Sequence, residues 1–230
     1  MKTSRHTPQL IRLTRLGAVN AFLVAEDDGL TLVDTMIPRS QDAILAAARA
    51  LDAPIVRIAL THAHGDHVGS LDALAAALPQ AEVSISARDA RFLTGDKSLD
   101  PDEPQSKLRG GYPTVSTRPG RLLQPGDRLG SLEVVAAPGH TPGQVAFLDT
   151  RDRTLIAGDA FSTLGGVATT ARPNPRFPLP GMAAWDRPTA LRTAKELRAL
   201  EPVRLAVGHG NVVEAPRAAM DAAIAKAEGR

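Results

Sequence analysis

The chain has 230 residues, of which 43% are hydrophobic and 23% charged, ordinary values for a globular protein whose few aromatics leave a core of aliphatic side chains. Its 27 basic and 25 acidic residues nearly balance and do not cluster as a nucleic-acid-binding surface requires, so we expect no nucleic-acid partner. The absence of cysteine excludes disulfides, cysteine-bound metals and thiol nucleophiles.

The first third of the sequence predicts three strands and a helix. Two strands are expected at 9–16 and 19–25, broken near a glycine, and a turn at 27–29 returns the chain into a strand at 30–34. A helix is expected over 40–51, and a proline separates it from the strand that follows. The residues before this sheet, which include His6, are predicted to be a tail.

The stretch 55–70 reads IVRIALTHAHGDHVGS and combines a buried strand with a cluster of polar residues. In an extended loop, His62 and His64 project to the same side and can grip one cation, whereas Asp66 and His67 point elsewhere and could serve a second. Three imidazoles and a carboxylate are ligands suited to zinc, iron or manganese.

The middle of the chain predicts a helix over 71–78, a strand over 82–86 and a short helix that ends near residue 93. The segment 94–119 is rich in glycine and proline without periodicity, which is typical of a loop that covers a site or is disordered. A second irregular segment is expected over 161–181.

The remaining elements are strands and helices that repeat the order of the first half. Strands are expected at 122–123, 129–136, 145–149, 154–157 and 203–207, with a helix at 186–200 and an alanine-rich helix at the end. This echo favours an α/β fold in which two halves pack sheet against sheet with helices outside, a four-layer αββα sandwich.

Three further polar residues, His140, Asp159 and His209, each follow an apolar strand beside a glycine. Five of the six histidines therefore lie at strand ends, which is not expected of histidines with structural roles. The neighbouring glycines would let the backbone approach a bound ion without a Cβ atom in the way; they are Gly139, Gly158, Gly208 and Gly210.

The string THAHGDH, followed by PGHTPG, AGD and VGHG, resembles the metallo-β-lactamase-fold hydrolase superfamily, in its glyoxalase II and lactonase-like branch, over nearly the whole chain. The resemblance implies a single domain of that fold over residues 1–230. The opening NAFLVAEDDGLTLVDT also looks like the first strands of the superfamily. Asp34 then has a structural role, in which it holds the metal loop through hydrogen bonds.

The resemblance further implies two divalent metal ions, zinc in the first place and iron or manganese otherwise. A first ion would be bound by His62, His64 and His140, a second by Asp66, His67 and His209, and Asp159 would bridge both. A hydroxide between the ions would be the nucleophile. Asp66 is hypothesised to transfer a proton to the leaving group.

Departures of this sequence from known branches of the superfamily narrow the class of substrate. True β-lactamases generally lack an aspartate such as Asp159. Glyoxalase II enzymes add a C-terminal helical domain, whereas only 21 residues follow His209 here. Lactonases commonly have a tyrosine where this chain has Ser162. The RNA-binding arm of tRNA-processing nucleases is not found. A hydrolase of small esters, lactones or thioesters is therefore expected.

The two irregular segments are expected to roof the substrate pocket. Its apolar wall candidates are Phe161, Phe177, Met182 and Trp185. Arg172 and Arg176 could hold a substrate carboxylate, although solvated arginines are equally consistent with the pattern.

Two alternatives stay open: a sulfur dioxygenase of the same fold with one iron, and a non-catalytic metal-binding protein. The partner is expected to be a small-molecule substrate, and the sequence leaves the oligomeric state open. No stretch approaches the ~18 apolar residues of a membrane span and no apolar leader is visible, so we expect a cytoplasmic protein that does not enter membranes.

Overall fold

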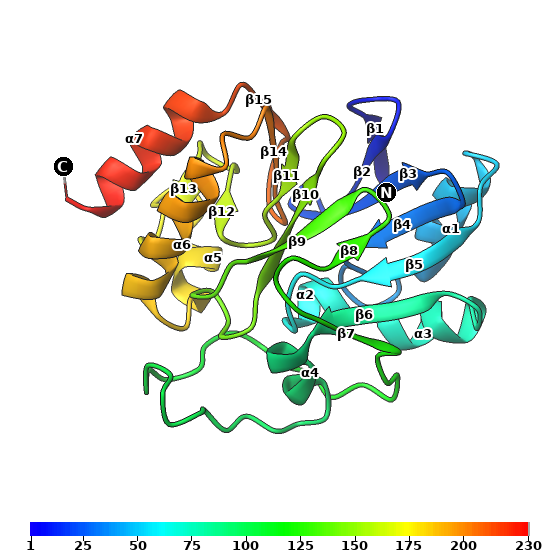
Figure 1. Ribbon diagram of the computed structural model, residues 1–230, viewed down its shortest axis with the longest axis horizontal. Coiled ribbons are helices and arrows are strands. Elements are labelled where there is room, and N and C mark those ends of the chain that lie inside the picture. The colour runs from blue at the N-terminus through cyan, green and yellow to red at the C-terminus, as the bar shows by residue number, and fades with distance from the viewer. Residues whose placement is uncertain (230) are drawn as a thin grey trace.

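The computed structural model describes residues 1–229 and consists of two stacked β-sheets with helices on both outer faces (Figure 1). The helices of the C-terminal half cover one sheet, and those of the N-terminal half cover the other, on the opposite side of the molecule. The predicted four-layer αββα sandwich is therefore confirmed.

The first sheet has seven strands in sequence order, antiparallel through its first four strands and parallel thereafter. Its strands are β1 (Lys2–Arg5), β2 (Leu10–Arg15), β3 (Val19–Glu26), β4 (Gly29–Val33), β5 (Ile55–Ala59), β6 (Glu82–Ser86) and β7 (Arg121–Leu123). The prediction of an N-terminal tail is wrong, because β1 pairs antiparallel with β2. The sequence of β1, KTSR, has no apolar alternation to reveal it, and backbone hydrogen bonds hold it at the sheet edge.

The second sheet has six strands in the order β15-β14-β11-β10-β9-β8, in which only β11 and β14 are parallel neighbours. They are β8 (Arg128–Leu129), β9 (Leu132–Ala136), β10 (Val145–Asp149), β11 (Thr154–Ile156), β14 (Arg204–Ala206) and β15 (Val213–Glu214). A turn at Gly130, whose φ is +59°, splits the predicted strand 129–136 in two. The irregular segment 161–181 contains a small hairpin of β12 (Phe161–Ser162) and β13 (Ala168–Thr169).

Seven helices surround the sheets in the described part of the chain. They are α1 (Gln41–Arg49), α2 (Gly65–Val68), α3 (Leu71–Ala77), α4 (Ala87–Leu93), α5 (Leu179–Ala183), α6 (Arg187–Ala199) and α7 (Arg217–Ala227). The predicted spacing on α3 is confirmed, since Leu71 and Leu74 are both buried. Side chains cap two helices: Ser86 accepts from the amide of Asp89 in α4, and Asp186 accepts from that of Thr189 in α6. No helix within residues 1–229 combines the length and apolarity needed to cross a membrane.

The space between the two sheets is filled by a layer of aliphatic residues and by two phenylalanines, Phe22 and Phe147. Further apolar clusters bind α1 and α3 to the first sheet and α6 and α7 to the second. Burial on both faces explains why β4 and β10 have no exposed residue.

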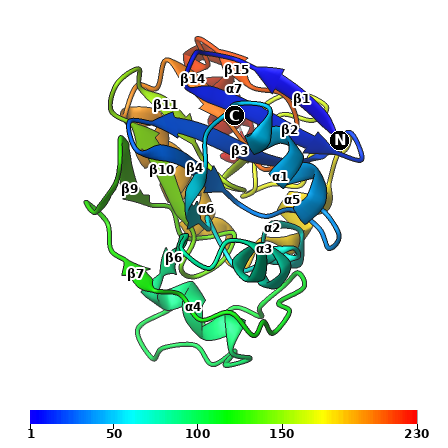
Figure 2. The ribbon, with the colours of Figure 1, turned by 90° about the vertical axis from the view of Figure 1, so that its right-hand side faces the viewer.

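Hydrogen bonds across the two sheets fix one edge of the sandwich. The amide of Val145 donates to the carbonyl of Thr61 at 2.9 Å, which joins the strand β10 to the loop after β5. Asn20, only 1% exposed, donates its side-chain amide to the carbonyls of Val207 (2.8 Å) and Gly210 (2.7 Å). The loops after β5, β9, β11 and β14 therefore meet at a common edge, while α4 and the long loop 94–120 extend at the bottom of both views (Figure 2).

Candidate metal centre

The seven residues predicted as metal ligands come together at this edge. Their ligand atoms form three overlapping groups, and within each group all of these atoms lie within 4.8 Å of one another. The groups are His62, His64 and His140; His62, His67 and Asp159; and Asp66, His67 and His209. Six of the seven residues are buried, whereas the carboxylate of Asp66 remains 36% exposed.

The local chain geometry separates the ligands as the spacing predicted. The chain leaves β5 in an extended loop, and His64 has φ −72° and ψ 150° just before α2 begins. His62 and His64 thus share one group with His140. The turn into α2 carries Asp66 and His67 to the other side, where they meet His209.

Asp34 holds the ligand loop through three kinds of hydrogen bond. Its carboxylate accepts from the backbone amide and the hydroxyl of Thr61, both at 2.8 Å, and from Nδ1 of His67 at 2.7 Å. Its backbone is held in the left-handed region, with φ +63°. These contacts match the structural role predicted for Asp34, and one of them is a direct hydrogen bond to the candidate ligand His67.

In three further histidine rings, the nitrogen that points away from the centre is hydrogen-bonded. His62 Nδ1 lies 3.0 Å from the Thr61 hydroxyl, which already donates to Asp34 and therefore accepts here. His64 Nε2 donates to the carbonyl of Arg109 at 3.0 Å, and His209 Nδ1 donates to that of Ala18 at 3.1 Å. At His62 and His64, whose pKa values burial lowers, this bond places the proton on the nitrogen that points away and leaves the lone pair of the other nitrogen facing the centre.

Several buried polar atoms in the centre have no hydrogen-bond partner within residues 1–229. They are Nε2 of His62, Nε2 of His67 and Oδ1 of Asp159. Each such atom costs about 1–3 kcal/mol if nothing compensates for its lost hydration. Nitrogen and carboxylate lone pairs concentrated in this way fit divalent transition-metal ions, so the residues present suit the ions that the sequence implies.

The electrostatics differ between the two ends of the centre. Burial lowers the pKa of His64 to about 4 and that of His140 to about 3, so both rings are neutral at pH 7. Burial also opposes the charging of His209, but the carboxylates of Asp159 and Asp66 outweigh it and raise its pKa to about 10. Asp159 Oδ2 lies 3.1 Å from His209 Nε2 and 3.4 Å from His140 Nε2, between the two ends.

Of the four glycines predicted to approach a bound ion, only Gly208 contacts the centre. A Cβ atom there would collide with Asp159 Oδ1 and lie 2.6 Å from His67 Cε1. Gly139, Gly158 and Gly210 instead allow close packing against Ala190, against Thr61 and against the segment 163–164. Gly110, which no sequence motif indicated, also contacts the centre, because a Cβ atom there would collide with the ring of His64.

A cavity of about 210 Å³ opens over the centre. Both irregular segments line it, as predicted: Gly110 and Gly111 come from the first, and Phe177, Leu179 and Pro180 from the second. Within residues 1–229, no lysine or arginine is among its lining residues. The cavity walls are therefore apolar except for the ligand candidates and backbone groups.

Three of the four predicted apolar wall residues lie elsewhere. Phe161 is fully buried in the core beneath α6 and α7, where its side chain packs with other apolar residues. Trp185 is buried and donates to the carbonyl of Ser106, and Met182 is 55% exposed outside the cavity lining. Only Phe177 lines the cavity, with its ring centroid 5.6 Å from that of His209.

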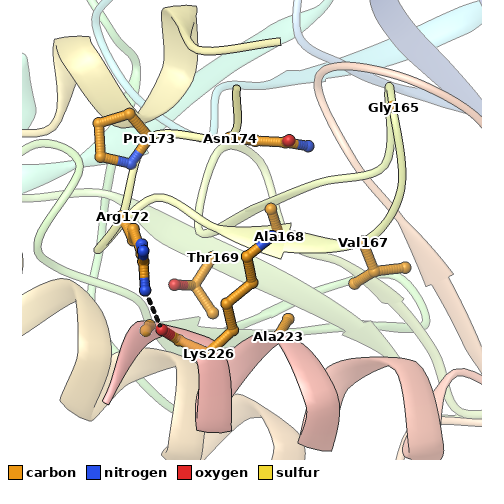
Figure 3. A pocket seen from close by; sticks show the side chains of 10 residues that line it. Gly165, Val167, Ala168, Thr169, Arg172, Pro173, Asn174, Ala223 and Lys226 are labelled. Carbon is orange, nitrogen blue, oxygen red and sulfur yellow. Dashed lines mark hydrogen bonds between the residues drawn. The ribbon is translucent and has the colours of Figure 1, made fainter. Parts of the chain in front are cut away.

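The predicted carboxylate-binding arginines also lie away from the cavity. Arg172 donates to the carbonyl of Lys226 at 2.7 Å, near the C-terminal end of α7, and lines a separate small cavity between β13 and α7 (Figure 3). A cation at this helix end complements the helix dipole, which explains its position. Arg176 is exposed and does not line the metal cavity.

Comparison with known proteins identifies relatives across the whole chain. The sequence model of the metallo-beta-lactamase superfamily matches residues 14–209. YobT of Bacillus subtilis (strain 168) is 47% identical over 221 residues, which cover 96% of this chain and 95% of YobT. A hydroxyacylglutathione hydrolase of Trichormus variabilis is 30% identical over 159 residues, 66% of this chain and 52% of that protein. Among solved structures, TTHA1623 in a di-iron-bound form is 28% identical with a TM-score of 0.64, covering 90% of this chain and 94% of that one.

Proposed function

The chain belongs to the metallo-beta-lactamase superfamily, and we propose that within it the protein is a hydrolase that uses two divalent metal ions to cleave a small ester, lactone or thioester. The observation that carries this proposal is the convergence of seven ligand-type side chains, in which Nε2 of His62, Nε2 of His67 and Oδ1 of Asp159 are buried without a hydrogen-bond partner within residues 1–229. The hydroxyacylglutathione hydrolase relative, whose name denotes thioester cleavage, supports the choice of bond.

We propose that each ion is held by one of the groups of candidate ligands described above. His62, His64 and His140 would hold one, Asp66, His67 and His209 the other, and Asp159, between the groups, would contact both. When bound, such ions supply an activated water and polarise the substrate's carbonyl oxygen. Zinc suits these nitrogen and oxygen donors; iron and manganese accept them too, and TTHA1623 is a relative found with two irons.

The residues of the chain itself orient the ligands and handle the proton. Asp34 fixes the ring of His67, and the carbonyls of Ala18 and Arg109 fix those of His209 and His64. Asp66 is the more exposed of the two carboxylates that line the cavity, with a side chain 36% exposed against 3% for Asp159. We propose that Asp66 Oδ2, which lies 3.2 Å from His209 Nε2, takes up a proton and passes it to the leaving group.

The cavity supports a small substrate without a negative charge. Its volume of about 210 Å³ is below the range typical of drug-sized ligand pockets. Phe177, Leu179 and Pro180 offer an apolar surface, and Leu179 is itself 62% exposed at the rim. Since no arginine or lysine of residues 1–229 lines the cavity, no side chain there would add a pairing with a substrate carboxylate or phosphate away from the ions.

The test is metal analysis of the purified protein coupled to a panel of lactones, thioesters, aryl esters and phosphodiesters. We expect two metal equivalents per chain and turnover of the uncharged carbonyl substrates. His64→Ala should lose at least about 100-fold in kcat/KM because a ligand is removed. His6→Ala is the matched control, since His6 lies on the connection between β1 and β2 and outside all three ligand groups.

Three results would contradict the proposal. Unchanged turnover in His64→Ala would remove the metal centre from the reaction. One iron per chain with thiol-dependent oxygen uptake would favour the sulfur dioxygenase. Tightly bound metal with no turnover of any substrate would favour the non-catalytic protein.

A further inference from the structure

Asp89, in the first turn of α4, is a fully buried carboxylate that contacts two loops of the metal centre. One of its oxygens, Oδ2, accepts from the backbone amide of Ala63 at 3.0 Å and from the hydroxyl of Thr141 at 2.7 Å. The other, Oδ1, accepts from the backbone amide of Gly143 at 2.7 Å. All three donors come from outside α4.

The positions of these donors are specific to one group of ligands. Ala63 lies between His62 and His64 in the chain, and Thr141 directly follows His140. The first loop follows β5 of one sheet and the second follows β9 of the other. A single carboxylate therefore joins the two segments that carry the group His62, His64 and His140.

The chemistry of these contacts requires a carboxylate. Three donors converge on two oxygens, which only an acceptor without hydrogens of its own can satisfy. An asparagine would direct its NH₂ group at a backbone N–H or a hydroxyl donor. The close approach also explains Gly143, where a Cβ atom would lie 2.6 Å from the amide nitrogen of Asp89 and 2.7 Å from its Oδ1.

We propose that Asp89 is a positioning residue that sets the metal affinity of the His62, His64 and His140 group and leaves that of the other group unchanged. The inference rests on the metal centre of the proposed function. Asp34 plays the corresponding part at the other end, where it bonds His67 directly. No hydrogen bond of the Asp89 carboxylate reaches Asp66, His67 or His209.

The test is a zinc titration of chelator-treated Asp89→Asn against a chromophoric competitor, which resolves the two affinities without reference to activity. We expect one affinity to fall by about 10- to 100-fold, the usual effect of losing a hydrogen bond that orients a ligand, and the other to stay as in the wild type. His140→Ala identifies the affected site. Combining it with Asp89→Asn should not weaken that site further, because both changes act on the same group.

Two variants separate positioning from a general loss of stability. Ser86→Ala removes the bond to the backbone amide of Asp89 but not those to its carboxylate, so it should lower the melting temperature and leave both affinities unchanged. Thr141→Val removes one of the three carboxylate contacts while keeping the side-chain shape, and should weaken the same site by roughly tenfold. The second variant also gives an answer if Asp89→Asn does not fold.

The outcomes that would overturn the inference are distinct from failure of the proposed function. If wild-type protein binds two zinc ions and Asp89→Asn or Thr141→Val keeps both affinities, Asp89 does not position the ligands. Equal weakening of both sites would assign it a structural role only. A wild-type chain that binds no zinc would overturn the metal centre itself.

Discussion

Replacing Gly208 by alanine should weaken metal binding at the group of Asp66, His67 and His209 while the protein stays folded. The backbone of Gly208 is not in the left-handed region, so alanine can adopt its conformation and the effect is one of space alone. The new methyl group would lie 2.6 Å from His67 Cε1, where ordinary contact begins at 3.4 Å, so the ring must move by about 0.8 Å. It would also displace the carboxylate of Asp159.

This displacement is large on the scale of metal coordination. Ligand distances in metal sites hold within about 0.2 Å, and Asp34 locks the ring of His67 from behind, so the ring cannot follow the ion. We expect zinc affinity at the group of Asp66, His67 and His209 to fall by more than about 100-fold, or ~2.8 kcal/mol. Overpacking should cost about 1–3 kcal/mol of folding free energy, which a domain of ordinary stability survives.

The assay is zinc content after gel filtration, with circular dichroism and thermal melting to check the fold. Gly111→Ala is the matched control: Gly111 lines the same cavity, has an ordinary φ, and its added methyl would meet nothing within 4 Å. It should bind zinc as the wild type does. If Gly208→Ala binds zinc as tightly as Gly111→Ala, the ligand positions described here are wrong.

Three further predictions concern the metal, the cavity and pH. Adding zinc to chelator-treated protein at 100 times its Kd should stabilise the fold by about 2.7 kcal/mol in urea denaturation, and no shift would exclude a site formed only in the folded state. Phe177→Ala should raise KM for apolar esters and leave zinc content unchanged, and an unchanged KM would place the substrate elsewhere. Burial opposes ionisation of Asp186, but hydrogen bonds from Thr189 outweigh it and lower its pKa. Asp186→Ala should therefore lower the free energy of unfolding by about 1 kcal/mol at neutral pH. This difference between wild type and variant should shrink as the pH falls through the lowered pKa, because the wild-type carboxylate is then protonated. A difference that does not depend on pH would contradict the capping role.

Much of the fold was predictable because its signals are local. The apolar run at Ile55–Ala59, the turn before Gly29 and the spacing of leucines on α3 each predict their element from a few neighbouring residues. The superfamily was predictable from a shared sequence pattern, THAHGDH with three later motifs, and the seven candidate ligands of that pattern come together, although their role as ligands stays a prediction. The predictions of a single domain over 1–230, of a cytoplasmic location and of a small-molecule partner stay predictions.

The features that escaped prediction depend on tertiary contacts. The strand β1 is held by its neighbour and not by its own polar sequence. Phe161 looks like a pocket residue because it follows Asp159, yet it faces the core beneath α6 and α7. Arg172 is directed to the end of α7, a helix more than forty positions later in the chain.

Apart from Asp34, the supporting residues of the centre had no predicted role. Asp89 lies outside every motif, and Asn20 begins the stretch NAFLVAEDDGLTLVDT without a contact that the sequence could indicate, because only the meeting of the two sheets brings both residues to the ligand loops. Gly110 lies in a segment with no regular pattern, and its contact with His64 depends on the path of that loop. Sequence motifs thus indicated the candidate ligands and Asp34, whereas the contacts of Asn20, Asp89 and Gly110 required coordinates.

Anomalous diffraction at the zinc absorption edge, from crystals of the zinc-loaded wild-type protein, tests the central claim most directly. We predict two peaks per chain, one among His62, His64 and His140 and one among Asp66, His67 and His209, with Asp159 within ligand distance of both. A single peak, or peaks away from these side chains, would contradict the account.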